Sequence, residues 1–179
     1  MTGKILPSLL SASRIVFAPF VVVSIMRGEM AQAVYLLMVA GSTDFFDGFL
    51  ARRYHWQTRT GEWMDGVADK TLLSAVFIAL ALAGVAPLWL VYLIFGRDLL
   101  ILLMAVIGLL FTPIRDFPPS VWGKLSTSVQ IVTALGMLLG LTTGRNVLIG
   151  ACATATAWSG AHYFYSAVKR LRALGSRTN

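Results

Sequence analysis

The sequence predicts an all-α membrane protein with six transmembrane helices, folded as a single domain over residues 1–179. Three observations support this fold class. The chain is 57% apolar and has a mean hydropathy of +0.75. Only 13% of its residues are charged, whereas soluble domains carry about 25%. Its apolar residues also fall into stretches of roughly 20, the length of helix that crosses a bilayer.

Connectors rich in Gly, Pro and charged residues separate the apolar stretches, and such residues mark turns. In chain order, the connectors are Arg27–Glu29, Thr58–Gly61, Gly84–Pro87, Thr112–Ser120 and Gly144-Arg145. The six helices that they delimit are Ser8–Met26, Met30–Arg52, Glu62–Gly84, Pro87–Phe111, Val121–Thr142 and Asn146–Lys169. No linker or low-complexity block interrupts this order, so we expect one domain.

Glycines recur every fourth residue towards the end of the fifth predicted helix. Gly136, Gly140 and Gly144 would therefore form a ridge of small residues along one helical face. Such ridges allow helix backbones to approach closely in membranes. We expect this ridge to pack inside the helix bundle rather than at a dimer interface.

Cationic residues fall unevenly on the two ends of the predicted helices. The end that carries both termini holds Lys4, Arg52, Arg53, Arg59, Arg115, Lys124, Lys169, Arg170, Arg172 and Arg177, whereas the opposite end holds Arg27 and Arg145. Because positive loops stay in the cytoplasm, we expect both termini there, together with the connector between the second and third helices. The formal net charge of +7 then reflects orientation and anionic lipid, and we expect no nucleic-acid partner.

Four aspartates flank that cytoplasmic connector, two on each adjacent helix. Asp44 and Asp47 lie about 12 and 8 Å below the end of the second helix, from the rise per residue of an α-helix. Asp65 and Asp69 lie about 6 and 12 Å into the third helix, counted from Gly61. Spacings of three and four residues put each pair on one helical face. If the two faces meet, the carboxylates converge just below the cytoplasmic surface.

Such a cluster needs compensating positive charge, because one aspartate at mid-bilayer costs about 2.5–3.5 kcal/mol. A divalent metal matches the number of carboxylates, and an all-oxygen ligand set favours Mg²⁺ or Mn²⁺ over Zn²⁺. Four carboxylates suit a two-metal site of the phosphoryl-transfer type. Two alternatives remain open: aspartates paired with arginines at a helix end, and a small cation or proton transporter. The opposite half of the membrane argues against transport, because its one acidic residue is Glu29, in a connector.

The residues of this region also spell a known signature. At fixed spacing, the chain has Asp44, Asp47, Gly48, Ala51, Arg52, Gly61, Asp65 and Asp69. This pattern resembles the signature of the CDP-alcohol phosphatidyltransferase family, and the six-helix architecture is similar to that family's as well. The resemblance implies an enzyme of phospholipid biosynthesis that forms a single transmembrane catalytic domain over residues 1–179.

The resemblance further implies a reaction and a set of metal ligands. A hydroxyl of an acceptor alcohol attacks the phosphorus of CDP-diacylglycerol that bears the lipid, and CMP leaves. By likeness, Asp44, Asp47 and Asp65 ligate two Mg²⁺ or Mn²⁺ ions. Asp69 would be the catalytic base and would also contact metal.

The same likeness places the donor nucleotide. Gly48, Ala51 and Arg52 would lie along the CDP moiety, where small residues let the nucleotide approach the helix. Gly61 would allow the turn into the third helix. A homodimer in the membrane is also implied.

The acceptor must be inferred from residues outside the signature. Residues 118–130 resemble a stretch that phosphatidylglycerophosphate synthases and cardiolipin synthases of this fold share. The apolar run Leu99–Phe111 is more similar to cardiolipin synthases, so we expect phosphatidylglycerol as acceptor, with glycerol 3-phosphate as the alternative. Both acceptors carry a phosphate, and the candidate cationic ligands are Arg97, Lys124 and Arg115. Alternatively, Arg97 and Asp98 are a structural pair, although adjacent helical residues point apart.

Overall fold

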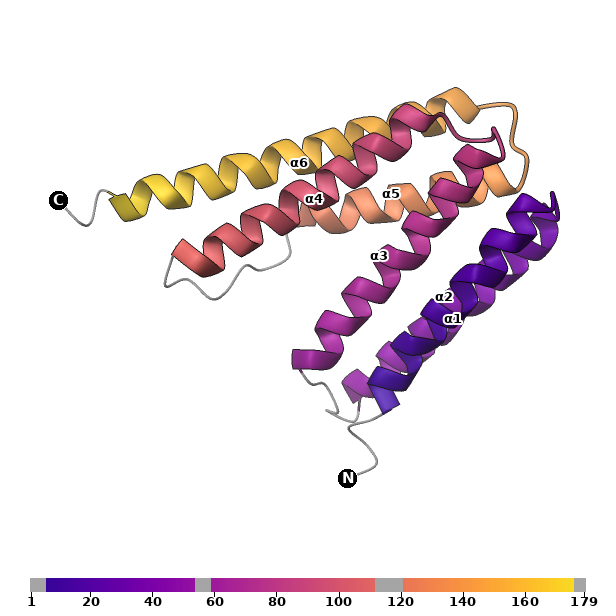
Figure 1. The fold of residues 1–179 in the computed structure, drawn as a ribbon, viewed down its shortest axis with the longest axis horizontal. Helices are drawn as coiled ribbons and strands as arrows, with labels where there is room; N and C mark the ends of the chain where they lie inside the picture. Colours follow the sequence, from indigo (N-terminus) through magenta and orange to yellow (C-terminus); the bar gives the residue numbers. More distant parts are fainter. Residues whose placement is uncertain (1–5, 54–58, 112–120, 176–179) are drawn as a thin grey trace. The chain divides into compact units, whose positions relative to one another are not determined.

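The computed structural model describes the backbone of residues 6–53, 59–111 and 121–175. Side chains are described for residues 15–42, 70–104, 106, 121–166, 168 and 169. The helices are α1 (Leu6–Met26), α2 (Met30–Arg53), α3 (Arg59–Leu82), α4 (Leu88–Phe111), α5 (Val121–Leu138) and α6 (Arg145–Gly175) (Figure 1). The described backbone contains no strand, so the prediction of an all-α chain with six helices is confirmed.

Most of the predicted helix bounds agree with the structure, and the largest differences lie at two C-terminal ends. Helix α5 ends at Leu138 rather than Thr142, and α6 continues to Gly175 rather than ending at Lys169. Over the stretches of helix that are described, none has the length and apolarity that a membrane span requires. The crossing of a membrane by all six helices stays a prediction.

The chain divides into two compact units. The first unit comprises Met1–Pro87 and Met137–Leu141, and it contains α1, α2 and α3. The second unit comprises Leu88–Gly136 and Thr142–Asn179, and it contains α4, α6 and most of α5. The assignment of residues 1–179 to a single domain stays a prediction.

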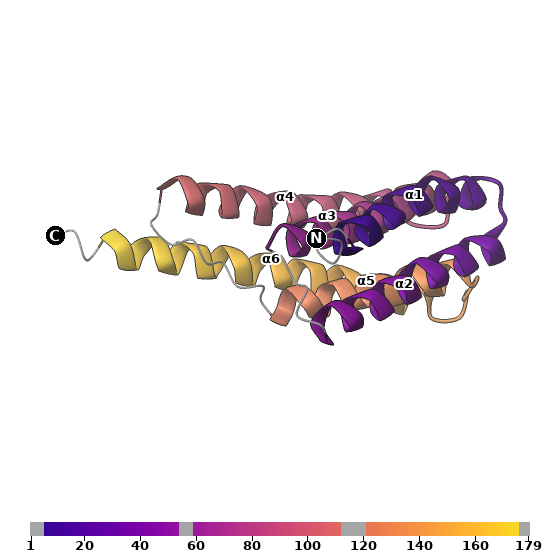
Figure 2. The same cartoon turned by 90° about the horizontal axis from the view of Figure 1, so that it is seen from below.

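Helix α1 is the common partner in the first unit, because it packs against both α2 and α3. Figure 2 shows α1 and α2 as an antiparallel pair joined by a tight turn. Gly28 makes that turn possible with a φ of 77°, a left-handed conformation that costs a glycine little. Its N–H donates to the Ile25 carbonyl at 3.0 Å, and the Glu29 N–H donates to the Ser24 carbonyl at 2.9 Å. These bonds satisfy carbonyls at the end of α1, so the predicted connector is a helix C-cap.

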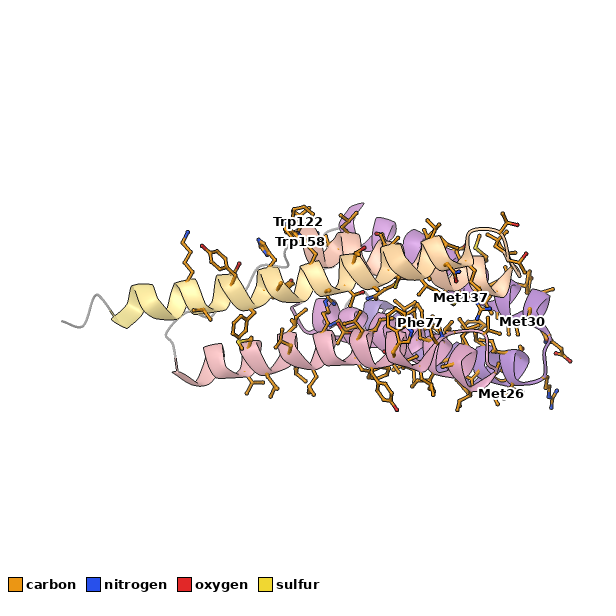
Figure 3. All side chains as sticks on the ribbon, turned by 90° about the horizontal axis from the view of Figure 1, so that it is seen from above. Met26, Met30, Phe77, Trp122, Met137 and Trp158 are labelled. Atoms are coloured by element: carbon orange, nitrogen blue, oxygen red, sulfur yellow. The ribbon has the colours of Figure 1, made fainter. Side chains whose placement is uncertain are left out.

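The core of the first unit is apolar. Its buried side chains come from all three helices, and Phe77 of α3 is the largest that is fully buried (Figure 3). The others include Val21, Ile25, Ala33, Ala40, Leu72, Val76 and Leu80. Positions 72, 76 and 80 recur every four residues, which puts one face of α3 into this core.

The second unit combines aromatic and polar packing. Helix α4 packs against α6. The rings of Trp122 on α5 and Trp158 on α6 meet edge to face, with centroids 6.0 Å apart (Figure 3). Edge-to-face pairs add about 0.5–1.5 kcal/mol beyond the burial of their area. This contact therefore helps to fix how α5 lies along α6.

The prediction of a glycine ridge on the fifth helix is wrong. Helix α5 ends at Leu138, and Gly140 and Gly144 lie beyond it with φ values of 69° and 94°. A Cβ placed at either position would find no atom within 4 Å. These glycines therefore end a helix and shape a connection, and they do not let helices approach one another. The spacing misled because glycines that break a helix can recur at the same interval as glycines that pack one.

Candidate functional site

The four aspartates of the signature lie on the two helices predicted for them, α2 and α3. Asp44 and Asp47 precede the last residue of α2 by nine and six positions, about 14 and 9 Å along the helix. Asp65 and Asp69 follow the first residue of α3 by six and ten positions, about 9 and 15 Å. The end of α2 and the start of α3 lie at the same end of the first unit (Figure 1). The backbone thus places the two pairs at matching depths.

The predicted nucleotide-binding residues follow the same two helices. Gly48, Ala51 and Arg52 lie in the last two turns of α2, and Gly61 lies in the first turn of α3. The side chains of these residues and of the four aspartates lie outside the described set. Their roles at a donor site stay predictions.

A divalent metal fits the donor atoms that the signature offers. Four carboxylates provide only oxygen ligands, which Mg²⁺ and Mn²⁺ prefer. Among the side chains that are described, no group of three or more His, Cys, Asp or Glu could hold a metal ion. The signature aspartates lie outside that set, so the assignment of a metal site to them stays a prediction.

Arg97 is the predicted site residue whose surroundings the structure describes in most detail. It lies on α4, and only 7% of its surface is exposed. Its Nη1 donates to Asp98 Oδ1 at 2.6 Å, and its Nη2 donates to the hydroxyl oxygen of Ser159 on α6 at 2.8 Å. This ion pair agrees with the alternative that Arg97 and Asp98 are a structural pair. Adjacent helical residues do not point apart here, because the long arginine side chain turns back to its neighbour's carboxylate.

Two glycines let other helices approach the Arg97 side chain. A Cβ at Gly123 of α5 would lie 3.3 Å from Arg97 Nη2 and 3.1 Å from Tyr163 Oη. A Cβ at Gly160 of α6 would lie 3.5 Å from Arg97 Cγ. Tyr163 closes the site with its ring centroid 6.0 Å from Arg97 Cζ, at the outer limit of a cation–π contact. We call the residues around this guanidinium the Arg97 cradle: Asp98, Gly123, Ser159, Gly160 and Tyr163.

One nitrogen of the Arg97 guanidinium makes no hydrogen bond within the cradle. Its Nε is buried and has no hydrogen-bond partner among the residues that the structure describes. A buried polar group without a partner is unfavourable, so such groups are rare in folded proteins. Nε is therefore the group of the cradle that an oxygen of an anionic ligand would satisfy, and a guanidinium suits phosphate in particular.

The other two candidate acceptor ligands differ from Arg97. Lys124 is exposed on α5, and it directly follows Gly123 of the cradle. Its backbone carbonyl accepts a hydrogen bond from Ser128 Oγ at 3.1 Å, as expected for a serine inside a helix. Arg115 lies outside the described residues. The structure thus buries one of the three predicted cations and leaves another at the surface.

Sequence reasoning missed the polar side chains that join α5 to α6. Gln130 Nε2 donates to Thr156 Oγ1 at 3.2 Å, and Ser126 Oγ lies 3.5 Å from the same atom. Ser159 lies one turn further along α6 and is fully buried. The sequence does hold a signal for these residues, because Ser126, Gln130 and Thr133 are spaced by four and then three positions in an apolar helix.

The chain is similar to known proteins whose names give two activities. The chain is 31% identical to a probable cardiolipin synthase (CMP-forming) of Drosophila melanogaster, over 75% of this chain and 47% of that protein. It is 36% identical to a probable phosphatidylglycerophosphate synthase of Mycobacterium tuberculosis, over 75% of this chain and 65% of that protein. It is 33% identical to the CDP-diacylglycerol–glycerol-3-phosphate 3-phosphatidyltransferase of Aquifex aeolicus, over 68% of each.

The share of each protein that these matches cover decides what they show about this chain. The chain spans about half of the length of the fly relative and 65% of the mycobacterial one. Residues 4–160 match the family model described as CDP-alcohol phosphatidyltransferase. That match covers most of the chain, including both helices of the signature and the Arg97 cradle up to Gly160. The chain therefore belongs to the CDP-alcohol phosphatidyltransferase family, whose members are transferases.

Proposed function

We propose that this protein transfers the phosphatidyl group of CDP-diacylglycerol to a hydroxyl of an anionic acceptor in a membrane, and releases CMP. Family membership supports the reaction class. The observation that carries the acceptor class is the buried Arg97 guanidinium, whose Nε has no hydrogen-bond partner among the described residues. A cation buried in this way suits an acceptor that carries a phosphate.

The distribution of polarity supports placement in a membrane. Large apolar side chains are exposed on several helices, including Phe20, Tyr35, Leu82, Leu99 and Val132. Buried side chains of the second unit include polar ones: Arg97, Ser126, Gln130, Thr133, Thr156 and Ser159. A soluble protein shows the opposite trend, whereas a bundle in lipid can use polar contacts between helices. Both termini and the aspartates would face the cytoplasm, as the positive charges predict.

The donor side of the proposed site comprises the signature residues of α2 and α3. Asp44, Asp47, Asp65 and Asp69 would hold two Mg²⁺ or Mn²⁺ ions. When bound, these ions supply positive charge that offsets the charge of the diphosphate and of the departing CMP.

Small residues of the signature leave room for the donor nucleotide beside the α2 backbone. We assign the surface along Gly48 and Ala51 to the CDP moiety, with Arg52 at its end and Gly61 in the first turn of α3.

Asp69 is the proposed base of the transfer. The oxygen of the acceptor hydroxyl attacks the phosphorus that bears the diacylglycerol, and a new P–O bond forms there. The bond from that phosphorus to the oxygen of CMP breaks, and the hydroxyl proton passes to the Asp69 carboxylate. A positioned base of this kind contributes about 10²–10⁴-fold to a rate.

Phosphatidylglycerol is the acceptor that the second unit supports best. On α4, the residues that follow Arg97 and Asp98 are apolar, and several are more than half exposed, including Leu99, Leu102 and Leu103. An acceptor with two acyl chains can lie along such a surface while its phosphate contacts Arg97. Lys124 and Arg115 would add positive charge near the headgroup. Glycerol 3-phosphate has no acyl chains and gains nothing from these leucines, so it is the alternative acceptor.

The test is a product assay in lipid vesicles, because detergent would disrupt the proposed acceptor surface. Purified protein in vesicles receives CDP-diacylglycerol and Mg²⁺ or Mn²⁺, with either phosphatidylglycerol or glycerol 3-phosphate. We expect CMP release together with a diphosphatidyl product that thin-layer chromatography separates. Chelation of the metal with EDTA should abolish release, and added Mg²⁺ or Mn²⁺ should restore it.

Other outcomes of that assay are equally informative. A phosphatidylglycerophosphate product would replace the proposed acceptor with glycerol 3-phosphate. No CMP release with either acceptor would contradict the transferase proposal and leave the two alternatives, aspartates paired with arginines and a small cation or proton transporter. Chemical cross-linking in the same vesicles tests the homodimer that we also propose, since a monomer alone would contradict it.

A further inference from the structure

The hydroxyl of Ser159 has a specific effect on the Arg97 guanidinium. It accepts from Nη2 at 2.8 Å, whereas the carboxylate of Asp98 accepts from Nη1 at 2.6 Å. The carboxylate neutralises charge, but the serine carries none. What Ser159 adds is direction, because a planar guanidinium held at both terminal nitrogens cannot rotate about its long axis. Ser159 is itself fully buried, so water does not compete for this bond.

Gly123 controls the same guanidinium by its size. A Cβ at this position would lie 3.3 Å from Nη2 and 3.1 Å from Tyr163 Oη, which is tighter than ordinary side-chain contact. Any larger residue would therefore push the guanidinium, the phenol or both. Ser159 and Gly123 reach Arg97 from two different helices, α6 and α5. Ser159 and Gly123 together restrict the orientation of the guanidinium, because Nη2 bonds to Ser159 and has little space beside Gly123.

That orientation determines where the Nε–H points. Nε is buried and, within the described part of the chain, has no partner. Its N–H lies in the guanidinium plane, so its direction is set once Nη1 and Nη2 are fixed. A phosphate oxygen that binds there forms a charge-assisted bond, which depends strongly on geometry.

We propose that Ser159 and Gly123 are positioning residues for the acceptor: they hold Arg97 so that its Nε–H meets the acceptor's phosphate. This inference rests on the proposed function, and it concerns acceptor binding alone. The donor's affinity does not depend on the orientation of Arg97. Loss of either residue therefore raises the KM for the acceptor and leaves the KM for CDP-diacylglycerol unchanged.

Ser126 provides a matched control for Ser159. Both are buried serines of the second unit, and both have a hydroxyl within hydrogen-bonding distance of a side chain on another helix. The partner of Ser126 is Thr156 rather than Arg97. Ser159→Ala and Ser126→Ala thus remove the same atom from similar surroundings. A merely structural role for buried serines predicts the same behaviour in both variants.

The experiment measures initial rates of CMP release from protein in vesicles. Acceptor and donor are varied separately, and lipid substrates are expressed as mole fractions. For Ser159→Ala, we expect the KM for the acceptor to rise about tenfold or more, as for loss of a hydrogen bond to a charged group. The KM for CDP-diacylglycerol should stay within about twofold of the wild-type value. Ser126→Ala should leave both constants within the same limit.

A second pair of variants tests Gly123 by adding a methyl group, whereas the serine variants remove a hydroxyl group. Gly123→Ala places a methyl group against Arg97 and Tyr163, and it should raise the KM for the acceptor alone. Gly150→Ala is the control, because a Cβ at this helical position on α6 would meet nothing within 4 Å. Thermal unfolding of all four variants in the same vesicles shows whether they fold.

Failure of this inference can be told apart from failure of the proposed function. No CMP release from the wild-type protein with either acceptor would overturn both. An active wild-type protein in which neither Ser159→Ala nor Gly123→Ala changes the KM for the acceptor would overturn the inference alone. It would also be overturned if the KM for the donor rose as much as the KM for the acceptor.

Discussion

The two units of the molecule assemble their chemical groups in different ways. In the first unit, the signature aspartates lie on consecutive helices, α2 and α3, joined by one short connector. In the second unit, the Arg97 cradle draws on three helices. Arg97 of α4 and Ser159 of α6 lie 62 positions apart in the chain and meet at 2.8 Å.

The two regions therefore differ in how far their chemistry can be predicted from the sequence. The signature aspartates lie on consecutive helices, so they form a short pattern that is visible in the sequence. Residues from three helices meet only through packing, and their relation depends on every residue between them. The proposed reaction type is therefore encoded locally, whereas the proposed acceptor preference depends on tertiary structure.

The largest effect should come from the first unit. Asp69→Asn keeps the size of the side chain but removes the proposed base, so kcat should fall about 10²–10⁴-fold with either acceptor. The assay is CMP release at saturating donor and acceptor. Glu29→Gln, the same chemical change in the exposed turn after α1, should have no effect. A wild-type kcat in Asp69→Asn would end the assignment of catalysis to the first unit.

We expect a substitution in the second unit to change the KM for the acceptor rather than kcat. Arg97→Lys keeps the positive charge but loses the fork of donors, so the KM for the acceptor should rise about 10–100-fold. The KM for CDP-diacylglycerol should not change, which vesicle assays at varied donor content would show. An equal rise in both constants would mean that the two regions are not functionally distinct.

Lys124 should show that burial decides how much a cation contributes. This residue is exposed, so solvent and ions screen its charge. Lys124→Gln should raise the KM for the acceptor only about two- to fivefold, as is typical of exposed charges. The difference from the wild-type protein should disappear at high salt, whereas the effect of Arg97→Lys should persist. An effect of Lys124→Gln that survives high salt would contradict the exposed position.

We expect the smallest effect from a substitution that lies outside both the signature residues and the Arg97 cradle. Gly140 has a φ of 69°, and an alanine in that conformation costs about 1 kcal/mol or more. Gly140→Ala should therefore lower the free energy of unfolding by about that amount, while kcat and both KM values stay unchanged. Chemical unfolding in detergent checks the stability. A more stable variant would indicate that α5 continues through this position, as the sequence first suggested.

These cases also show what the sequence could and could not predict. The six helices were predictable because the length of an apolar stretch and the connectors around it are local properties. The positions of Asp44 and Asp69 on their helices were predictable for the same reason. The bond from Ser159 to Arg97 was not, because no local pattern relates residues so far apart. Gly140 shows a different limit, since its spacing fits a helix face and its backbone conformation does not.

The pairing of Arg97 with its immediate neighbour has a consequence for biosynthesis. Asp98 leaves the ribosome directly after Arg97, so α4 contains its own counter-charge before α5 and α6 exist. An unpaired arginine at mid-membrane costs about 2.5–3.5 kcal/mol during insertion. We predict that a nascent chain truncated after residue 111 integrates α4 efficiently, and that Asp98→Ala lowers this efficiency in a glycosylation-mapping assay. Equal integration of both chains would contradict it. The helix would thus enter lipid as a neutral segment, and it would deliver its cation to the cradle only when later helices arrive.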